Sequence, residues 1–320
     1  MSSSGKRHPA EAADSGKRIS NPLSFLWLEL TNRCNLQCTH CYAESGPGTS
    51  QQDTMSGSDY ERLICEASDI GCRQLQFIGG EPTMNRDLPR LVQKAARTGY
   101  DFIEVFTNLT LLSDALIGCF KEHRVHVATS VYAAESGVHD RVTRVGGSFE
   151  RTVTGLRRLL TAGIPVRAGI VAMSENSSCV EATVEFLHEL GVKNVGVDRL
   201  RRFGRGALPD EKSGMEELCG SCADSTLCIA PDGGVSPCIM SKTWSIGSCR
   251  DARLRDLVHS DRLQSVRNQI RSAVSESRLK PGSYPDSETC FPCGPDANCP
   301  PCAPNTSCDP TTCRPYRLPN

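Results

Sequence analysis

The chain has 320 residues, with 36 Lys or Arg against 37 Asp or Glu, so its formal net charge is −1. Without a basic excess or a long block of like charges, the sequence predicts no nucleic-acid or anionic-membrane partner. Residues 1–22 are polar, without the apolar segment of a secretory signal, and no run of about 18 apolar residues follows that could cross a bilayer. We therefore expect a cytoplasmic protein with a flexible tail over residues 1–22.

Strand-like and helix-like patterns alternate from residue 25 to about residue 201. The predicted strands are rich in apolar and β-branched residues and cover 25–31, 75–80, 102–108, 125–133, 166–173 and 194–201. Helical patterns fill the gaps at 56–71, 87–99, 111–123, 148–163 and 179–191. Such alternation predicts an α/β fold with a parallel sheet and right-handed crossovers, either doubly wound or a barrel. In both folds, function gathers at the carboxyl ends of the strands.

The alternation stops near residue 208. Residues 209–320 contain one helical stretch, 251–274, and are otherwise rich in Cys, Pro, Gly and Asp. We interpret 23–208 as one domain and 209–320 as a second, small domain. A cysteine-rich segment with so few apolar residues usually depends on bound metal for order.

Eighteen cysteines are unusual for a chain expected in a reducing compartment, and they favour metal or redox chemistry over disulfides. Four are scattered singly and are expected to be small apolar core residues: Cys65, Cys72, Cys119 and Cys179. The others form three groups: Cys34, Cys38 and Cys41; then Cys219, Cys222, Cys228, Cys238 and Cys249; then Cys290, Cys293, Cys299, Cys302, Cys308 and Cys313.

Two motifs follow the first two predicted strands. The first is Cys34-x3-Cys38-x2-Cys41, and the second is the sequence GGEP at residues 79–82. A structural zinc site would need a fourth ligand, and His40 is too near in sequence for comfortable tetrahedral spacing. The sequence GGEP alone could be a strand-to-helix turn. Together, the two motifs resemble those of the radical S-adenosylmethionine (radical SAM) family.

This resemblance implies a partial (β/α)6 TIM-like barrel that holds a [4Fe–4S] cluster on three cysteines. The fourth iron stays open, and S-adenosylmethionine would bind there and yield a 5′-deoxyadenosyl radical, with flavodoxin or ferredoxin as the reductant. The resemblance assigns the methionine amine to Gly79, Gly80 and Glu81, the carboxylate and ribose to Ser130 and Asn108, and the adenine to His40. Ser130 could instead be a structural strand residue.

The C-terminal cysteines resemble the SPASM or shorter twitch extensions, which carry one or two auxiliary [4Fe–4S] clusters. Cys222, Cys228 and Cys238 match a first auxiliary cluster, with the sequence PDGG (231–234) as a turn between two short strands. Cys219 or a cysteine of the tail could be the fourth ligand. Cys290, Cys293, Cys299 and Cys302 match a second cluster, except that two residues precede Cys302 where the pattern has three. A zinc site in the tail is the alternative.

Cys249 belongs to none of these ligand spacings. It could be a spare buried thiol, or it could return a hydrogen atom to a substrate carbon, as a cysteine does in related radical epimerases. A residue in a segment that closes over the barrel mouth would suit that role. We therefore interpret Cys249 as a candidate catalytic residue.

Three functions remain open. The first is an epimerase of a sugar carbon in antibiotic biosynthesis, similar to the radical aminoglycoside epimerases of the neomycin C type, with Asp198 and Glu104 as possible partners of substrate amines. The second is a SPASM enzyme that modifies a ribosomally made peptide by thioether formation, cross-linking or epimerisation. The third is a non-catalytic metal scaffold, which would leave the open three-cysteine site without a purpose. The substrate is thus expected to be a small molecule or a peptide.

Overall fold

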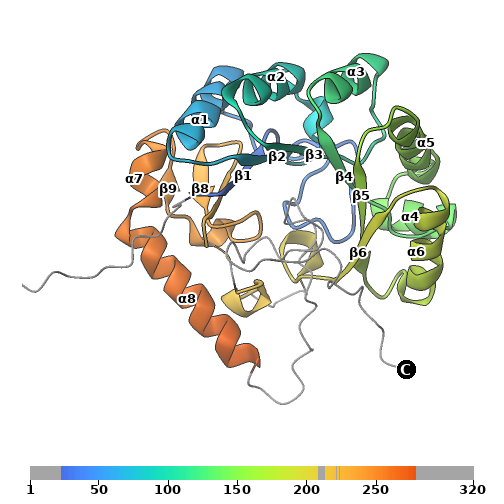
Figure 1. The fold of residues 1–320 in the computed structure, drawn as a ribbon. Helices are drawn as coiled ribbons and strands as arrows, with labels where there is room; N and C mark the ends of the chain where they lie inside the picture. The colour runs from blue at the N-terminus through green and yellow to red at the C-terminus, as the bar shows by residue number, and fades with distance from the viewer. Residues whose placement is uncertain (1–22, 208–212, 221, 223, 279–320) are drawn as a thin grey trace, which may run out of the picture.

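One continuous sheet organises the part of the chain that the computed structural model describes, residues 23–207, 213–220, 222 and 224–278 (Figure 1). Its strand order is β6-β5-β4-β3-β2-β1-β7-β8-β9. The expected tail, 1–22, and the second auxiliary set, Cys290, Cys293, Cys299 and Cys302, lie outside the described residues.

The first six strands form the curved, open wall of a partial barrel, and every pairing between neighbours is parallel. They are β1 (Phe25–Glu29), β2 (Gln74–Ile78), β3 (Phe102–Phe106), β4 (His126–Ser130), β5 (Val166–Ala172) and β6 (Asn194–Arg199). Each strand begins within one residue of the start predicted from the sequence and ends slightly before the predicted end. The expected α/β fold with a parallel sheet is therefore confirmed.

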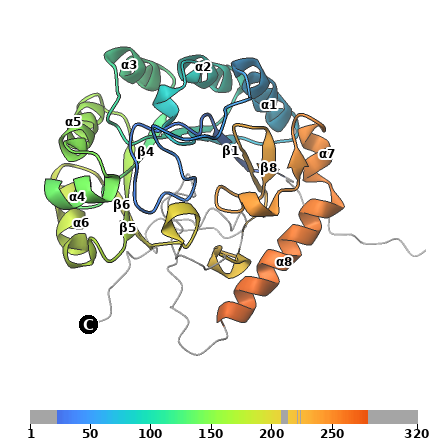
Figure 2. The ribbon, with the colours of Figure 1, turned by 180° about the vertical axis from the view of Figure 1, so that it is seen from behind.

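Helices cover the outer side of this wall, as Figures 1 and 2 show from opposite directions. They are α1 (Gly57–Asp69), α2 (Leu88–Thr98), α3 (Asp114–Glu122), α4 (Ser136–Thr143), α5 (Ser148–Thr161) and α6 (Val180–Glu189). α1 begins with a capping box, in which Ser56 and Asp59 satisfy each other's backbone N–H groups. The sequence pattern missed α4, because His139 and Thr143 are two of its three buried residues and are not apolar.

The C-terminal segment extends the sheet of the barrel. β7 (Thr226–Ile229) pairs in parallel with β1, and the short strands β8 (Gly234–Ser236) and β9 (Gly247–Ser248) follow antiparallel. The predicted turn over 231–234 does join two short strands. The predicted helical stretch 251–274 is two helices, α7 (Leu254–Val258) and α8 (Asp261–Arg278), and the Ser260 hydroxyl caps α8 by accepting from the Leu263 N–H at 3.2 Å. Short 3-10 turns complete the structure: η1 (Pro82–Met84), η2 (Ser177–Cys179), η3 (Gly204–Gly206), η4 (Met215–Glu217) and η5 (Lys242–Trp244).

The interior of the barrel is sealed by a charged pair far from the carboxyl ends of the strands. Glu104 is 1% exposed, and Arg167 donates to its two carboxylate oxygens at 2.7 and 2.6 Å. Glu104 also lines a cavity with His126 and Val166, which begin β4 and β5. The interpretation of Glu104 as a partner for substrate amines is therefore wrong, since its carboxylate is already paired and lies beside the amino ends of the strands.

The described helices include none with the length and apolar character needed to span a bilayer.

Candidate active site

The loop after β1 carries the three-cysteine motif, and the loop after β2 supports it through backbone hydrogen bonds. The Gly80 N–H donates to the Thr31 carbonyl at 2.7 Å, and the Glu81 N–H donates to the Arg33 carbonyl at 2.8 Å. A Cβ on Gly80 would lie 2.2 Å from the Arg33 carbonyl oxygen, and Gly79 has a φ of +143°. Both positions therefore require glycine, the first for close approach and the second for its backbone conformation.

Glu81 ties two strand ends together and does not line the pocket. Its side chain is fully buried and accepts from the Thr83 N–H at 3.0 Å, the Thr107 hydroxyl at 2.6 Å and the Asn108 N–H at 2.8 Å. The Thr83 hydroxyl is a further donor, at 2.6 Å. Burial raises the pKa of this carboxyl, although these hydrogen bonds oppose the shift. The Glu81 side chain therefore braces the strand ends, and the contact of Gly79, Gly80 and Glu81 with the methionine amine stays a prediction.

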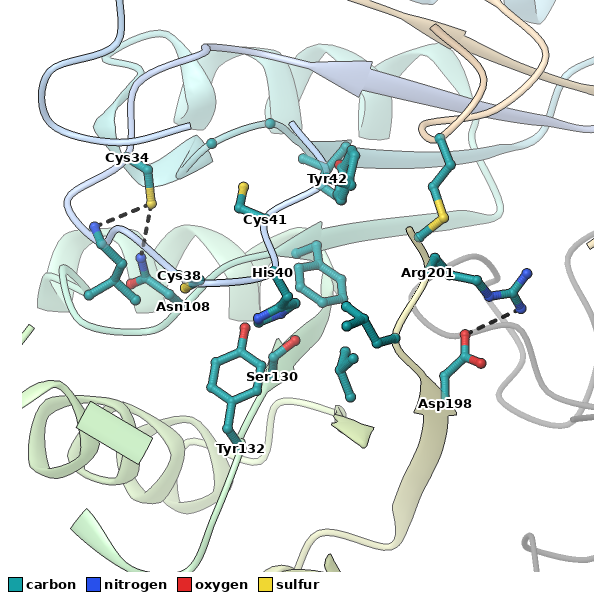
Figure 3. Close-up of a pocket in the computed structure, with 18 of the residues that line it drawn as sticks. Cys34, Cys38, His40, Cys41, Tyr42, Asn108, Ser130, Tyr132, Asp198 and Arg201 are labelled. Atoms are coloured by element: carbon teal, nitrogen blue, oxygen red, sulfur yellow. Dashed lines mark hydrogen bonds and ion pairs between the residues drawn. The ribbon is translucent and has the colours of Figure 1, made fainter. Parts of the chain in front are cut away.

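A pocket opens at the carboxyl ends of the strands (Figure 3). The residues that give it its chemistry are Cys34, Cys38, His40, Cys41, Gly79, Gly80, Asn108, Ser130, Tyr132, His139, Asp198, Arg199 and Arg201. Figure 3 shows the three cysteines on one side of the pocket and the Asp198–Arg201 pair on the other. Except for Glu81, the structure thus brings all the residues expected to hold the cluster and S-adenosylmethionine to one cavity.

The three thiols suit a cluster bound inside the protein. Cys34 is 8% exposed, and burial raises the pKa of Cys34 and of Cys38 to about 12. Without metal these groups are protonated at neutral pH, so iron binding must displace their protons. Soft thiolate ligands of this kind select iron–sulfur clusters or zinc, and three of them leave one iron of a cubane without a protein ligand.

The imidazole of His40 has a buried nitrogen atom, Nδ1, that makes no hydrogen bond with any described residue. Burial lowers its pKa to about 4, so the ring is neutral, and it packs edge-on against Tyr132 with the ring centroids 4.8 Å apart. A neutral imidazole with an unused nitrogen fits a contact to a purine base, which agrees with the role that the family resemblance gives to His40.

Asn108 and Ser130 follow or end neighbouring strands and both line the pocket. The Asn108 side-chain amide donates to the side-chain oxygen Oδ1 of Asn35 at 2.9 Å and lies 3.9 Å from the Cys34 sulfur. Asn108 therefore contacts the cysteine loop directly, whereas Ser130 lies beside the Tyr132 hydroxyl. Their contacts to carboxylate and ribose stay predictions.

Sequence reasoning missed Tyr132 and His139. Tyr132 lies two residues after Ser130 on an extended chain, so the alternation of side chains could have assigned it to the same face. His139 comes from α4, which the pattern did not predict, and its Nδ1 accepts from the Tyr132 N–H at 3.3 Å. Both rings form the wall of the pocket next to His40.

Three cysteine sulfurs of the C-terminal segment lie close together. The Cys222 sulfur lies 3.4 Å from the sulfur of Cys219 and 3.3 Å from that of Cys238. Cys228 is fully buried, and burial raises the pKa of its thiol. The assignment of these cysteines as ligands of the first auxiliary cluster, with Cys219 as its local fourth ligand, stays a prediction.

Cys249 does not reach the pocket. It is 2% exposed, and its backbone is held by a bond from its N–H to the Gly233 carbonyl at 2.9 Å. Its carbonyl accepts from Arg62 of α1 at 3.2 Å, and it lines a separate cavity with Asp59 and Arg62. The segment therefore packs against α1 and does not close over the barrel mouth as expected, because β9 continues the sheet outward from β8.

Comparison with known proteins agrees with this geometry. The profile of the radical SAM superfamily matches residues 28–187, half of the chain, and that of the SPASM iron–sulfur cluster-binding domain matches residues 219–294. The chain belongs to the radical SAM superfamily. It therefore uses a [4Fe–4S] cluster with S-adenosylmethionine, and its SPASM domain implies auxiliary iron–sulfur clusters.

Curated relatives of this radical SAM chain include probable GTP 3′,8-cyclases. That of Metallosphaera sedula is 29% identical over 63% of both chains. That of Saccharolobus islandicus is 28% identical over 60% of this chain and 61% of the relative. The chain thus spans less than two thirds of the length of these relatives.

Solved structures with a similar fold include Streptococcus suis SuiB bound to S-adenosylmethionine. It has a TM-score of 0.64 at 16% identity and covers 78% of this chain and 68% of SuiB. The native enzyme anSMEcpe with bound S-adenosylmethionine has a TM-score of 0.62 at 15% identity, covering 81% of this chain and 86% of its own. At such identities the likeness shows the fold, which is that of a radical SAM partial barrel.

Proposed function

We propose that this radical SAM enzyme epimerises a sugar carbon of an aminoglycoside in antibiotic biosynthesis. The bound cluster and S-adenosylmethionine supply the radical that removes a substrate hydrogen atom. Cys34, Cys38 and Cys41 hold the cluster, His40 contacts the adenine, and Asn108 and Ser130 hold the rest of the cofactor. Asp198 is a buried carboxylate that lines the pocket 3.5 Å from Arg201, and we assign a substrate amine to it in exchange for that partner.

The pocket that brings Cys34, Cys38 and Cys41 together with Asp198 carries this proposal, and Cys249 is the hydrogen-atom donor that the proposal assigns. Burial raises its pKa, with the Arg62 charge acting in the opposite direction, so the S–H form dominates at neutral pH. A hydrogen-atom donor must be in that form. The step breaks the Cys249 S–H bond and forms a substrate C–H bond on the opposite face. One electron and one proton then restore the thiol, with flavodoxin or ferredoxin as the proposed electron source.

Cys249 lies outside the pocket, so the donor role requires the substrate-bound enzyme to bring the thiol and the carbon together. The test is Cys249→Ala, incubated anaerobically with S-adenosylmethionine and an aminoglycoside in deuterated water. Wild type should place one deuterium at the inverted carbon. The variant should still form 5′-deoxyadenosine and keep its iron, but should form no epimer. Cys65→Ala, a cysteine on α1, is the matched control and should epimerise normally.

Normal epimerisation by Cys249→Ala would eliminate this thiol as the donor. Absence of turnover with any aminoglycoside, in an enzyme that cleaves S-adenosylmethionine, would refute the substrate class.

A peptide substrate is the second candidate. Its support is the similarity in fold to SuiB bound to its precursor peptide SuiA, and to anSMEcpe with bound peptides. In that case a cysteine-containing peptide should stimulate 5′-deoxyadenosine formation and change in mass, whereas an aminoglycoside should not. GTP is the third substrate to include, because curated relatives carry the name GTP 3′,8-cyclase.

A further inference from the structure

A charged pair lies between the two groups of cysteines and has no part in the mechanism above. Glu29 ends β1 and is 1% exposed, and its Oε2 lies 2.6 Å from the Nζ of Lys242 in η5. The pair joins the first strand of the barrel to the SPASM segment. Burying the Glu29 carboxylate costs desolvation energy that an ion pair with the partly exposed Lys242 only partly offsets, so the position of the pair calls for a reason beyond stability.

The sheet register places Glu29 beside an auxiliary cysteine. Cys228 on β7 is directly opposite Trp27 on β1, and Glu29 is two residues further along the same strand. Because side chains alternate along a strand, Trp27, Glu29 and Cys228 point to the same, inner face of the sheet. Both charges act on the Cys228 sulfur: Glu29 raises its pKa together with burial, and Lys242 lowers it.

The pair also reaches toward the open cluster. The Tyr42 hydroxyl, next in sequence to Cys41, donates to Glu29 Oε1 at 3.4 Å, and Tyr42 lines the pocket near Cys41 in Figure 3. Although burial acts in the opposite direction, the Glu29 carboxylate raises the pKa of Lys242, and negative charge at Cys228 and at Cys41 acts in the same direction as Glu29. Lys242 is thus a cation of η5 that is electrostatically linked to both cysteine groups.

We propose that the Glu29–Lys242 pair sets the reduction potential of the auxiliary cluster held at Cys228, with Lys242 raising the potential and Glu29 lowering it. Reduction adds one negative charge to a thiolate-bound cluster. A cation near the cluster stabilises that added charge and a carboxylate destabilises it, and each effect is stronger the less water surrounds the charge. Burial and neighbouring charge are among the means by which proteins set such potentials.

The test compares charge removals of opposite sign. The background carries Cys34→Ala, Cys38→Ala and Cys41→Ala, so the open cluster contributes no signal, and the potential is read by redox titration with electron paramagnetic resonance. Lys242→Met should shift the auxiliary potential to more negative values, and Glu29→Gln should shift it to more positive values. The double variant should return close to the starting potential. Shifts in one common direction, or no shift, would overturn the proposal.

Controls separate charge from folding. Lys242→Arg keeps the charge and should keep the potential, whatever its effect on stability. Glu104→Gln removes a carboxylate that is as deeply buried but lies at the opposite end of the barrel, and should leave the potential unchanged. The Lys242 side chain is 33% exposed, so Lys242→Met should fold and decide the question even if Glu29→Gln does not. None of these measurements needs a substrate, so the proposal stands or fails independently of the epimerase assignment.

Discussion

Single residues show where motif reasoning succeeds and where it stops. One pocket contains the three motif cysteines, Gly79 and Gly80, because the carboxyl ends of parallel strands lie at the same end of the barrel. The alternation of strands and helices in the sequence predicts this arrangement. The role of Glu81 could not be predicted in this way, since its partners Thr83 and Thr107 become neighbours through the fold. Glu104 was misplaced for a similar reason: the sequence showed a carboxylate in a strand but not its depth in the barrel.

His139 predicts a pH dependence of stability. It is 1% exposed, and burial lowers its pKa from 6.5 to about 4, a difference worth about 3 kcal/mol. The unfolded chain therefore binds this proton more readily. The free energy of unfolding should be unaffected by His139 above about pH 6.5 and should fall progressively as the pH drops toward 4.

The measurement is denaturant unfolding of wild type and His139→Asn, under anaerobic conditions, between pH 4 and pH 8. Asparagine keeps an acceptor for the Tyr132 N–H but does not titrate in this range. The two free energies should differ by a constant amount above about pH 7, and the difference should move in favour of the variant below about pH 6.5. Curves that remain parallel down to pH 4 would show that His139 is not the group responsible.

Whole elements were easier to predict than single side chains. All six barrel strands and five of their helices follow from periodicity and capping residues, because these signals are local. α4 was missed since its buried face is polar, and the pairing of β7 with β1 was missed because it joins residues about 200 positions apart. The loop between β2 and η1 is another local element with a structural role, because its glycines allow close packing against the cysteine loop.

Gly80→Ala should therefore damage the open cluster selectively. The added Cβ would lie 2.2 Å from the Arg33 carbonyl oxygen, so the cysteine loop must shift, at a cost of about 1–3 kcal/mol. The reconstituted variant should lose roughly four irons and form no 5′-deoxyadenosine, while its auxiliary iron remains. Gly118→Ala, inside α3 with nothing within 4 Å of the added Cβ, should keep full iron content. Equal iron loss in both variants would contradict this explanation.

The molecule as a whole joins the two cysteine-bearing parts through one sheet. β7 lies against β1, which leads directly into the three-cysteine loop, so the first auxiliary set and the open cluster are held by neighbouring strands. The sequence pattern predicts a cluster site at each cysteine group, but it indicates no sheet that joins residues 209–320 to the barrel. Apolar pattern alone could not reveal the continuity, because β7, β8 and β9 have four, three and two residues.

Iron content tests how many clusters this assembly carries. If the open site, the Cys222 set and the Cys290 set each hold a cluster, the anaerobically reconstituted chain should bind about twelve irons, at roughly four per cluster. Replacing Cys34, Cys38 and Cys41 by Ala should leave about eight irons. It should also abolish 5′-deoxyadenosine formation, because the electron that cleaves S-adenosylmethionine then has no cluster from which to reach it. Replacing Cys290 and Cys293 by Ala should also leave about eight irons, but with the open cluster retained. If the unmodified chain binds about eight irons and the Cys290 and Cys293 substitutions leave that number unchanged, the enzyme has one auxiliary cluster. If the unmodified chain instead binds stoichiometric zinc and these substitutions remove it, the tail holds a zinc site.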